Sequence, residues 1–410
     1  MRPRRLRVAV GSGVLTAVTV AAAGCGLGPG DQPSGSPAPQ PTQQASSPSP
    51  SPSESGKPKA LATNLSVPWG LAFLPDGGAL VTQRDKGTIV RVTAQGQVTD
   101  SGKVAGVAAG GEGGLLGIAV SPDFTSDRYV YAYYTSASDN RIVRMKWTDS
   151  GQVDGSAKGQ QVVLKGIPKG AVHNGGRLAF GPDGMLYAST GETGQGSEAQ
   201  DKKSLGGKIL RMTPDGKPAK GNPFGTLVWS YGHRNVQGMA WDAKGRMYAT
   251  EFGQDKLDEI NRIEPGKNYG WPEVEGKGGG GKYVNPLVTW PTNEASPSGL
   301  AYAGGTLFAA ALQGQRLWTI PVSGSGSLGK PKAILTAQYG RLRTVVPAPD
   351  NKSLWVTTSN RDGRGEPRPG DDKVIMIPLK GKKGGKGKSN SPTPSPPKKS
   401  KGQGPNPTEL

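Results

Sequence analysis

The sequence predicts an all-β protein whose central part folds as a six-bladed β-propeller. Three observations lead to this prediction. One pattern of two short strands joined by a turn occurs six times, the chain contains 65 glycines and 36 prolines, and residues 60–379 show no sustained helical period. Glycine and proline at this level suit the many tight turns that such a fold needs between short strands.

The repeat consists of a short apolar strand, a turn containing Asp, Gly or Asn, and a second apolar strand. The six copies are Gly70-LAFLPDGGALVTQ, Gly117-IAVSPDFTSDRYVYAYY, Arg177-LAFGPDGMLYAST, Gly238-MAWDAKGRMYATE, Gly299-LAYAGGTLFAAAL and Thr344-VVPAPDNKSLWVTTS. Their starts lie 47, 60, 61, 61 and 45 residues apart, which leaves room for about four strands in each unit. A β-sandwich is the alternative fold, but it does not account for six units.

Residues 1–24 are predicted to be a lipoprotein signal peptide. Residues 2–7 are basic, residues 8–23 are small and apolar, and Cys25 follows as the only cysteine of the chain. We therefore predict lipidation at Cys25, which would anchor the protein at the extracellular face of the bacterial cell membrane. An ordinary secretory signal with an incidental cysteine is the alternative. With one cysteine, the chain has no intramolecular disulfide to form.

Two low-complexity segments flank the predicted propeller, which we place at residues 60–380. Residues 25–59 are rich in Pro, Ser, Gln and Gly and are predicted to be a disordered stalk, and residues 381–410 a disordered basic tail rich in Lys and Pro. The formal net charge of +19 lies largely at the two ends of the chain. Because the central part has no basic stripe with interleaved aromatic residues, we do not expect nucleic-acid binding. The tail either attracts an anionic polymer or lipid surface or is simply solvated.

The two histidines of the chain occupy equivalent places in the repeat. His173 lies shortly before the third copy and His233 shortly before the fourth. Loops at one end of a propeller gather around the central axis, so residues that precede the repeats converge there. His173 is therefore a candidate general base. The alternative, which is common for a histidine in a loop, is a residue that only forms hydrogen bonds.

An acidic, glycine-containing segment follows the fourth repeat at residues 251–261. It carries carboxylates and backbone carbonyl groups close together, and Ca²⁺ prefers six to eight oxygen ligands. A solvated polar turn is the alternative. No spacing of Cys and His fits zinc, and no glycine-rich loop precedes a helix as a Rossmann or P-loop nucleotide site requires.

Four motifs occur in order along the central part of the chain. They are Gly111-EGGLLG, His173-NGGRLAFGPDG, Gly232-HRNVQG and Asp258-EIN, the last followed by Asn268-YGWP. Together they resemble the glucose/sorbosone dehydrogenase family, whose members include soluble aldose sugar dehydrogenases that depend on pyrroloquinoline quinone (PQQ). The resemblance covers nearly all of residues 61–379. It implies a six-bladed propeller, in agreement with the repeat count, and PQQ-dependent oxidation of aldose sugars at the anomeric carbon to lactones.

The resemblance also implies roles for individual residues. His173 would be the general base, which takes the proton of the anomeric hydroxyl while hydride passes to the quinone. Arg234 would stabilise charge on the reduced quinone. The residues implied to hold the quinone are Arg234, Asn235, Gln313, Arg341 and Arg343. The implied sugar contacts are Glu112 and Glu192. The backbone carbonyls of Gly253 and Gln254 would bind a Ca²⁺ that also contacts the quinone, and Glu259 with the Tyr269 carbonyl would bind a second, structural Ca²⁺.

Three positions differ from the residue common in the family. Glu112 stands where Gln is frequent, Glu192 where Asp is frequent, and Gln313 where a lysine contacts the quinone. The missing charge at Gln313 keeps a second hypothesis open, a non-catalytic carbohydrate-binding propeller lipoprotein on the cell surface. His173 with the arginines favours the dehydrogenase, for which we expect a small sugar as substrate and a separate electron acceptor.

Overall fold

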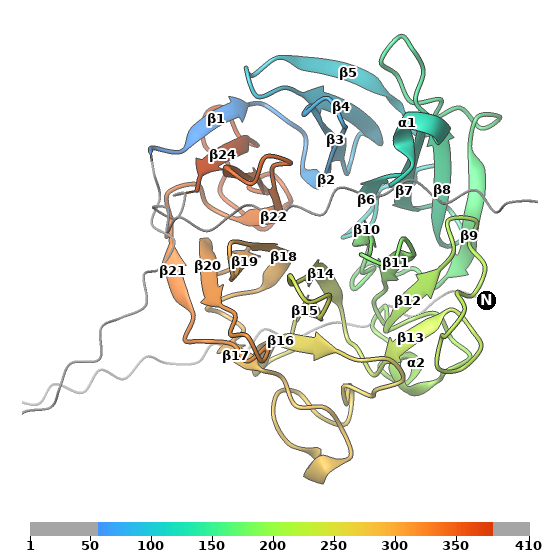
Figure 1. Ribbon diagram of the computed structural model, residues 1–410, viewed down its shortest axis with the longest axis vertical. Coiled ribbons are helices and arrows are strands. Elements are labelled where there is room, and N and C mark those ends of the chain that lie inside the picture. The colour runs from blue at the N-terminus through green and yellow to red at the C-terminus, as the bar shows by residue number, and fades with distance from the viewer. Residues whose placement is uncertain (1–55, 380–410) are drawn as a thin grey trace, which may run out of the picture. The chain divides into compact units, whose positions relative to one another are not determined.

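Six four-stranded antiparallel sheets contain all the named strands of the computed structural model, which describes residues 56–379. Figure 1 shows the sheets arranged around a common centre. The prediction of an all-β, six-bladed propeller is confirmed. Within the described residues, helix is limited to α1 (Phe124–Asp127), α2 (Ser197–Gln200) and the 3-10 turn η1 (Gly279–Gly281).

The first five blades follow the chain, and the strands of each are hydrogen-bonded in sequence order. They are β2 (Pro68–Phe73), β3 (Ala79–Gln83), β4 (Thr88–Val92) and β5 (Val98–Lys103); β6 (Leu115–Val120), β7 (Tyr129–Thr135), β8 (Asn140–Lys146) and β9 (Gln161–Ile167); β10 (Leu178–Phe180), β11 (Leu186–Ser189), β12 (Lys208–Met212) and β13 (Val228–Tyr231); β14 (Val236–Trp241), β15 (Met247–Glu251), β16 (Leu257–Ile263) and β17 (Val288–Pro291); and β18 (Pro297–Ala303), β19 (Thr306–Ala311), β20 (Arg316–Pro321) and β21 (Lys332–Ile334).

The sixth blade joins both ends of the described chain. It contains β22 (Leu342–Pro347), β23 (Ser353–Thr358), β24 (Val374–Pro378) and β1 (Lys59–Ala62). Strand β1 pairs antiparallel with β24, with Lys59 opposite Met376. The first strand thus completes the last sheet, which closes the ring of blades and leaves fewer unpaired edges.

Each sequence repeat forms the first two strands of one blade, for example β2–β3 and β10–β11. The first strands of neighbouring blades contact one another, as β14 contacts β18 and β18 contacts β22. The core lies between adjacent sheets, where for instance Phe308 of β19 and Val356 of β23 belong to one buried cluster. The strands closest to the centre are therefore the most apolar and the easiest to detect in the sequence.

A glycine opens four of the repeats because the neighbouring blade leaves no room for a side chain. A Cβ atom on Gly117 would lie 2.2 Å from the carbonyl oxygen of Gly176, and one on Gly238 would lie 2.3 Å from that of Ser298. Gly70 and Gly299 are similarly close to the next blade. These glycines therefore permit the close approach of backbones between adjacent first strands.

Arg177 takes the place of this glycine in the third blade, and its side chain extends across the centre of the propeller. Its Nε donates to the carbonyl of Gln237 at 2.7 Å and one Nη donates to Oγ1 of Thr344 at 3.0 Å. The guanidinium lies 4.4 Å from the ring centre of Trp69. Burial, with the charge of Arg343 nearby, lowers the pKa of Arg177 to about 9. Arg177 thereby connects four blades.

The predicted signal peptide, Cys25, most of the stalk and the basic tail lie outside the described residues. The described chain starts and ends at the same end of the propeller, because β1 runs antiparallel to β24 and Lys59 lies beside Met376. In residues 56–379, no helix is both long and apolar enough to cross a membrane.

Candidate active site

Two adjoining cavities lie at the end of the propeller where the first strands begin and the second strands end. The arginine cavity, with a volume of about 200 Å³, contains Arg84, Arg343 and Asp362. The histidine cavity, of about 270 Å³, contains His173 and Arg234. The two cavities share five lining residues, which are Glu112, Phe252, Leu312, Arg341 and Arg364.

His173 faces the histidine cavity, and Glu192 holds its ring from behind. The Nδ1 atom of His173 lies 2.5 Å from Oε1 of Glu192, whose side chain is 2% exposed. Glu192 follows β11 and lines neither cavity. A carboxylate on Nδ1 leaves Nε2 as the ring nitrogen that a ligand can reach. The structure therefore places Glu192 against the candidate base, whereas the resemblance implied a contact with the sugar.

Glu112 lies beside the backbone of His173 and borders both cavities. Its Oε2 accepts the backbone N–H of His173 at 2.9 Å, and its Oε1 pairs with Nη1 of Arg364 at 2.7 Å. Burial alone would raise the pKa of Glu112, but this N–H group and the charge of Arg364 outweigh burial and hold the pKa below its usual range. Glu112 is thus an ionised hydrogen-bond acceptor, suited to a hydroxyl group.

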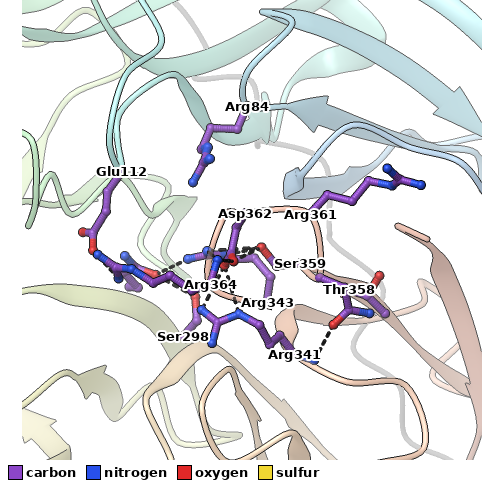
Figure 2. Close-up of polar contacts among 12 residues, drawn as sticks. Arg84, Glu112, Ser298, Arg341, Arg343, Thr358, Ser359, Arg361, Asp362 and Arg364 are labelled. Carbon is purple, nitrogen blue, oxygen red and sulfur yellow. Dashed lines mark hydrogen bonds and ion pairs between the residues drawn. The ribbon is translucent and has the colours of Figure 1, made fainter. Parts of the chain in front are cut away.

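Arg341 and Arg343 converge on the carboxylate of Asp362, as Figure 2 shows. Their Nη2 atoms lie 2.9 and 3.2 Å from Oδ2 of Asp362, and all three side chains are almost fully buried. Burial would raise the pKa of Asp362, but the two arginines outweigh it and lower the pKa. One carboxylate between two guanidinium groups leaves an excess of positive charge in the arginine cavity.

Arg234 and Asn235 lie directly before β14, but of these two only Arg234 lines a cavity. Its Nη1 donates to the carbonyl of Phe252 at 3.3 Å, while its Nε is buried with no partner in residues 56–379. Asn235 is fully buried, and its Oδ1 accepts the N–H of Gly175 at 3.0 Å. Its Nδ2 also has no partner within the described chain. The Nε of Arg234 is therefore a buried donor beside the histidine cavity that can bind an acceptor group of a ligand.

The loop after β15 brings backbone carbonyl groups to the histidine cavity. Gly253 and Gln254 line this cavity, and no donor of the described residues bonds to either carbonyl oxygen. Oε1 of Glu275 fixes the loop, because it accepts the N–H groups of residues 254–257 at 2.8 to 3.1 Å. Gln313 is an exposed residue at the border of the same cavity.

A third cavity, of about 10 Å³, has room for roughly one water molecule or one ion. Glu251, Glu259, Glu275 and Tyr269 are among its lining residues. Glu251 and Glu259 lie opposite each other on β15 and β16, and burial, with Glu251 nearby, raises the pKa of Glu259 to about 8. No three His, Cys, Asp or Glu side chains of the described chain are grouped closely enough to hold a metal ion. A cation at this position would therefore also need carbonyl oxygens.

His233 has the equivalent position in the fourth blade but a different environment. Its ring is fully buried, with Nε2 at 2.8 Å from Oγ of Ser230 and Nδ1 at 2.9 Å from Oε2 of Glu251. It also stacks on the ring of Tyr269 at 4.7 Å. Both nitrogens are in use, so His233 is not available as a base in the cavities.

Four charged residues that line the cavities received no role from the sequence, namely Arg84, Asp258, Asp362 and Arg364. Arg84 and Asp362 follow the second strands of the first and sixth blades, just as Glu192 follows that of the third. Second strands end where first strands begin, because the two are antiparallel. The residues after each second strand are thus as good candidates for the site as the residues before each first strand.

A model of the family described as glucose/sorbosone dehydrogenase matches residues 65–366. The chain belongs to the glucose/sorbosone dehydrogenase family. The resemblance inferred from the four motifs is therefore confirmed, and the family supports an oxidoreductase of the sugar dehydrogenase type.

Three members of this family illustrate the similarity. The PQQ-bound form of aldose sugar dehydrogenase from Streptomyces coelicolor is 56% identical, with a TM-score of 0.76 over 80% of this chain and 100% of that chain. Aldose sugar dehydrogenase YliI from Escherichia coli is 32% identical over 74% of this chain and 90% of its own length. Quinoprotein glucose dehydrogenase B from Acinetobacter calcoaceticus is 33% identical over 53% of this chain and 52% of its own length.

Proposed function

We propose that this protein catalyses the PQQ-dependent oxidation of aldose sugars at the anomeric carbon, which yields lactones. The observation that carries the proposal is His173, oriented by Glu192, in a cavity next to an excess of arginine charge. A protein that only bound carbohydrate would have no need of a general base beside the positively charged arginine cavity. The sugar dehydrogenases of the same family support this reaction class.

In the proposed reaction, His173 accepts the proton of the anomeric hydroxyl at Nε2. Glu192 keeps the other ring proton on Nδ1, and it stabilises the positive charge that forms on the imidazole. The anomeric carbon loses hydride, which carries two electrons, and its C–O bond becomes the carbonyl of the lactone. When bound, PQQ supplies the quinone carbonyl that receives these electrons. Glu112 would accept a hydrogen bond from a neighbouring sugar hydroxyl and orient the ring.

The described residues fit a planar tricarboxylate. Arg341 and Arg343 present two guanidinium forks, which suit carboxylates in bidentate geometry. Arg234 lines the histidine cavity and holds a buried Nε donor that has no acceptor among residues 56–379, and Asn235, which lines neither cavity, lies next to it in the chain. Gln313 at the border of the cavity would contribute hydrogen bonds but no charge.

We also propose Ca²⁺ as a second cofactor. The free carbonyls of Gly253 and Gln254 would bind one ion in the histidine cavity, where it would supply Lewis-acid chemistry. Glu259 and the Tyr269 carbonyl would bind another at the small third cavity. Burial, with the nearby Glu251, raises the pKa of Glu259, and a cation beside these two facing carboxylates would favour the charged form of Glu259.

Location at the extracellular face of the cell membrane remains part of the proposal, through a lipid on Cys25. The described chain begins and ends at the end of the propeller remote from the cavities. A tether attached there leaves the mouth of the site accessible to sugars. Fractionation of cells that express wild type and Cys25→Ser tests this point, because only the variant should leave the membrane fraction.

The proposed activity can be tested with purified protein, an artificial electron acceptor dye and a panel of aldoses. We expect dye reduction to require both PQQ and Ca²⁺ and the product to be the lactone, which NMR identifies. Sugar binding without dye reduction under these conditions would instead support the non-catalytic carbohydrate-binding protein.

A further inference from the structure

Arg84 and Arg364 enter the arginine cavity from segments other than the one that carries Arg341 and Arg343. Arg84 directly follows β3 in the first blade, and Arg364 lies in the loop between β23 and β24. Figure 2 shows Arg84 reaching toward the cluster around Asp362 from the opposite side to Arg341. The cavity is thus bordered by four guanidinium groups from three separate chain segments.

The carboxylates present do not balance these four charges. Asp362 serves both Arg341 and Arg343 through a single oxygen, and Glu112 pairs with Arg364. The partner of Arg84 is Asp85, at 2.6 Å, and its side chain is 44% exposed outside the cavity lining. Burial, together with the nearby charges of Arg84 and Arg341, lowers the pKa of Arg343 to about 10 despite Asp362. The cavity therefore lacks negative charge that a ligand can supply.

The arginines differ in their freedom to move. The side chains of Arg84, Arg341 and Arg343 are 6–7% exposed. That of Arg364 is 60% exposed, and among residues 56–379 its one ion-pair partner is Glu112. An exposed ion pair of this kind contributes little stability and exchanges its partner readily. Arg364 also borders both cavities, so its side chain lies where a ligand that spans them must pass.

We propose that Arg84 and Arg364 form a second carboxylate clamp, which faces the clamp of Arg341 and Arg343 and holds another edge of a planar polycarboxylate. The inference rests on the proposed function, for which PQQ is the ligand. On binding, Arg364 leaves Glu112 for a ligand carboxylate. Glu112 then retains only the N–H of His173, and its freed oxygen is available to a sugar hydroxyl. Cofactor binding thereby prepares the sugar site.

Isothermal titration calorimetry of PQQ into full-length protein with excess Ca²⁺ tests the clamp. Arg84→Gln and Arg364→Gln should each weaken binding by about 10–100-fold, the range for one lost charge-assisted hydrogen bond. The corresponding Lys variants should recover part of the loss. Arg361→Gln is the matched control from the same loop, because Arg361 lines neither cavity and donates to the carbonyl of Asp371. It should change the affinity by less than about twofold.

The variant Glu112→Gln shows whether Arg364 exchanges Glu112 for a PQQ carboxylate or whether the ion pair of Arg364 and Glu112 is purely structural. If Arg364 exchanges Glu112 for PQQ, this variant should bind PQQ at least as tightly as wild type, opposite to Arg364→Gln. If Glu112→Gln and Arg364→Gln weaken PQQ binding equally, the proposed exchange is overturned. If Arg84→Gln and Arg364→Gln leave the affinity for PQQ unchanged, the proposed clamp is overturned. Wild type that binds PQQ through the clamp but oxidises no aldose contradicts only the proposed function. Wild type that binds no PQQ contradicts both.

Discussion

The Nδ1 atom of His173 lies 2.5 Å from the carboxylate of Glu192, and Glu192 lies outside both cavities. The carboxylate of Glu192 therefore contacts the imidazole ring of His173 directly. This arrangement fixes which ring nitrogen carries the proton, and it leaves Nε2 as the acceptor.

Glu192→Gln should consequently lower kcat without weakening PQQ binding. The amide keeps the shape of the side chain but removes the charge that stabilises the imidazolium, and we expect a loss on the order of 10²-fold or more. Glu192→Asp, which keeps the charge, should retain more activity than Glu192→Gln. Dye-reduction kinetics and PQQ titration on the same preparations measure both quantities. A parallel loss of PQQ affinity and kcat in Glu192→Gln would indicate a general structural role.

Asp362→Asn should destabilise the protein without cofactor, because it leaves two buried guanidinium groups without a carboxylate. The expected loss in the free energy of unfolding is about 3 kcal/mol. PQQ should then raise the Tm of this variant by more than that of wild type, since its carboxylates replace the missing charge. Thermal melts with and without PQQ decide the point, and equal Tm shifts in the two proteins would contradict it.

Asp362 should also make the stability of the folded protein depend on pH. The pKa of Asp362 in the folded protein is lower than its usual value of about 3.9, so the unfolded chain binds a proton more readily. Its contribution to stability is present above pH about 4 and is lost as the pH falls through the folded pKa. Urea unfolding between pH 3 and 7 should therefore show a steeper acid loss in wild type than in Asp362→Asn.

Removal of Ca²⁺ should lower the Tm and the affinity for PQQ together. The first effect follows from loss of a ligand that binds only the folded state, and it amounts to about 2.7 kcal/mol when the ion is present at 100 times its Kd. Glu259→Gln should reduce the calcium-dependent Tm shift but leave PQQ affinity largely intact, because Glu259 lines only the small third cavity. A Tm that excess chelator leaves unchanged would argue against both sites.

Gly117→Ala should destabilise the propeller, because the added Cβ would lie 2.2 Å from the carbonyl oxygen of Gly176 in the next blade. Overpacking costs about 1–3 kcal/mol, and a contact with backbone belongs at the upper end of this range. Activity should fall as well, since Gly176 lies three residues after His173. Gly324→Ala is the control, because no atom lies within 4 Å of its added Cβ. Equal Tm values for the two variants would contradict this account of blade packing.

The sequence predicts the fold well where burial and turn chemistry coincide. The first two strands of every blade are apolar and joined by tight turns, so their six copies are visible in the chain. The outer strands are harder to recognise, as β5 (Val98–Lys103) is largely exposed. The pairing of β1 with β24 depends on contacts between residues more than 300 positions apart, and local patterns carry no information about it.

The site was predictable only in part, for a related reason. His173 lies in a recognisable motif before a first strand, and Arg341 and Arg343 lie at the start of the first strand β22. Asp362 and Arg364 lie in a polar loop that resembles any solvated turn in sequence, and only the closed ring of blades brings them to the cavities. Glu192 was identified as a site residue, but its contact with His173 depends on the course of the loop after β11.

The rate at which an aldose reduces the bound quinone tests the central claim most directly. Stopped-flow absorbance of protein loaded with PQQ and Ca²⁺ should show a single turnover when sugar is added. An aldose deuterated at the anomeric carbon should react more slowly, because the C–H bond breaks in this step. His173→Gln should bind the quinone normally but reduce it about 10²–10⁴-fold more slowly. Equal rates in wild type and His173→Gln, or no reduction in wild type, would contradict the account.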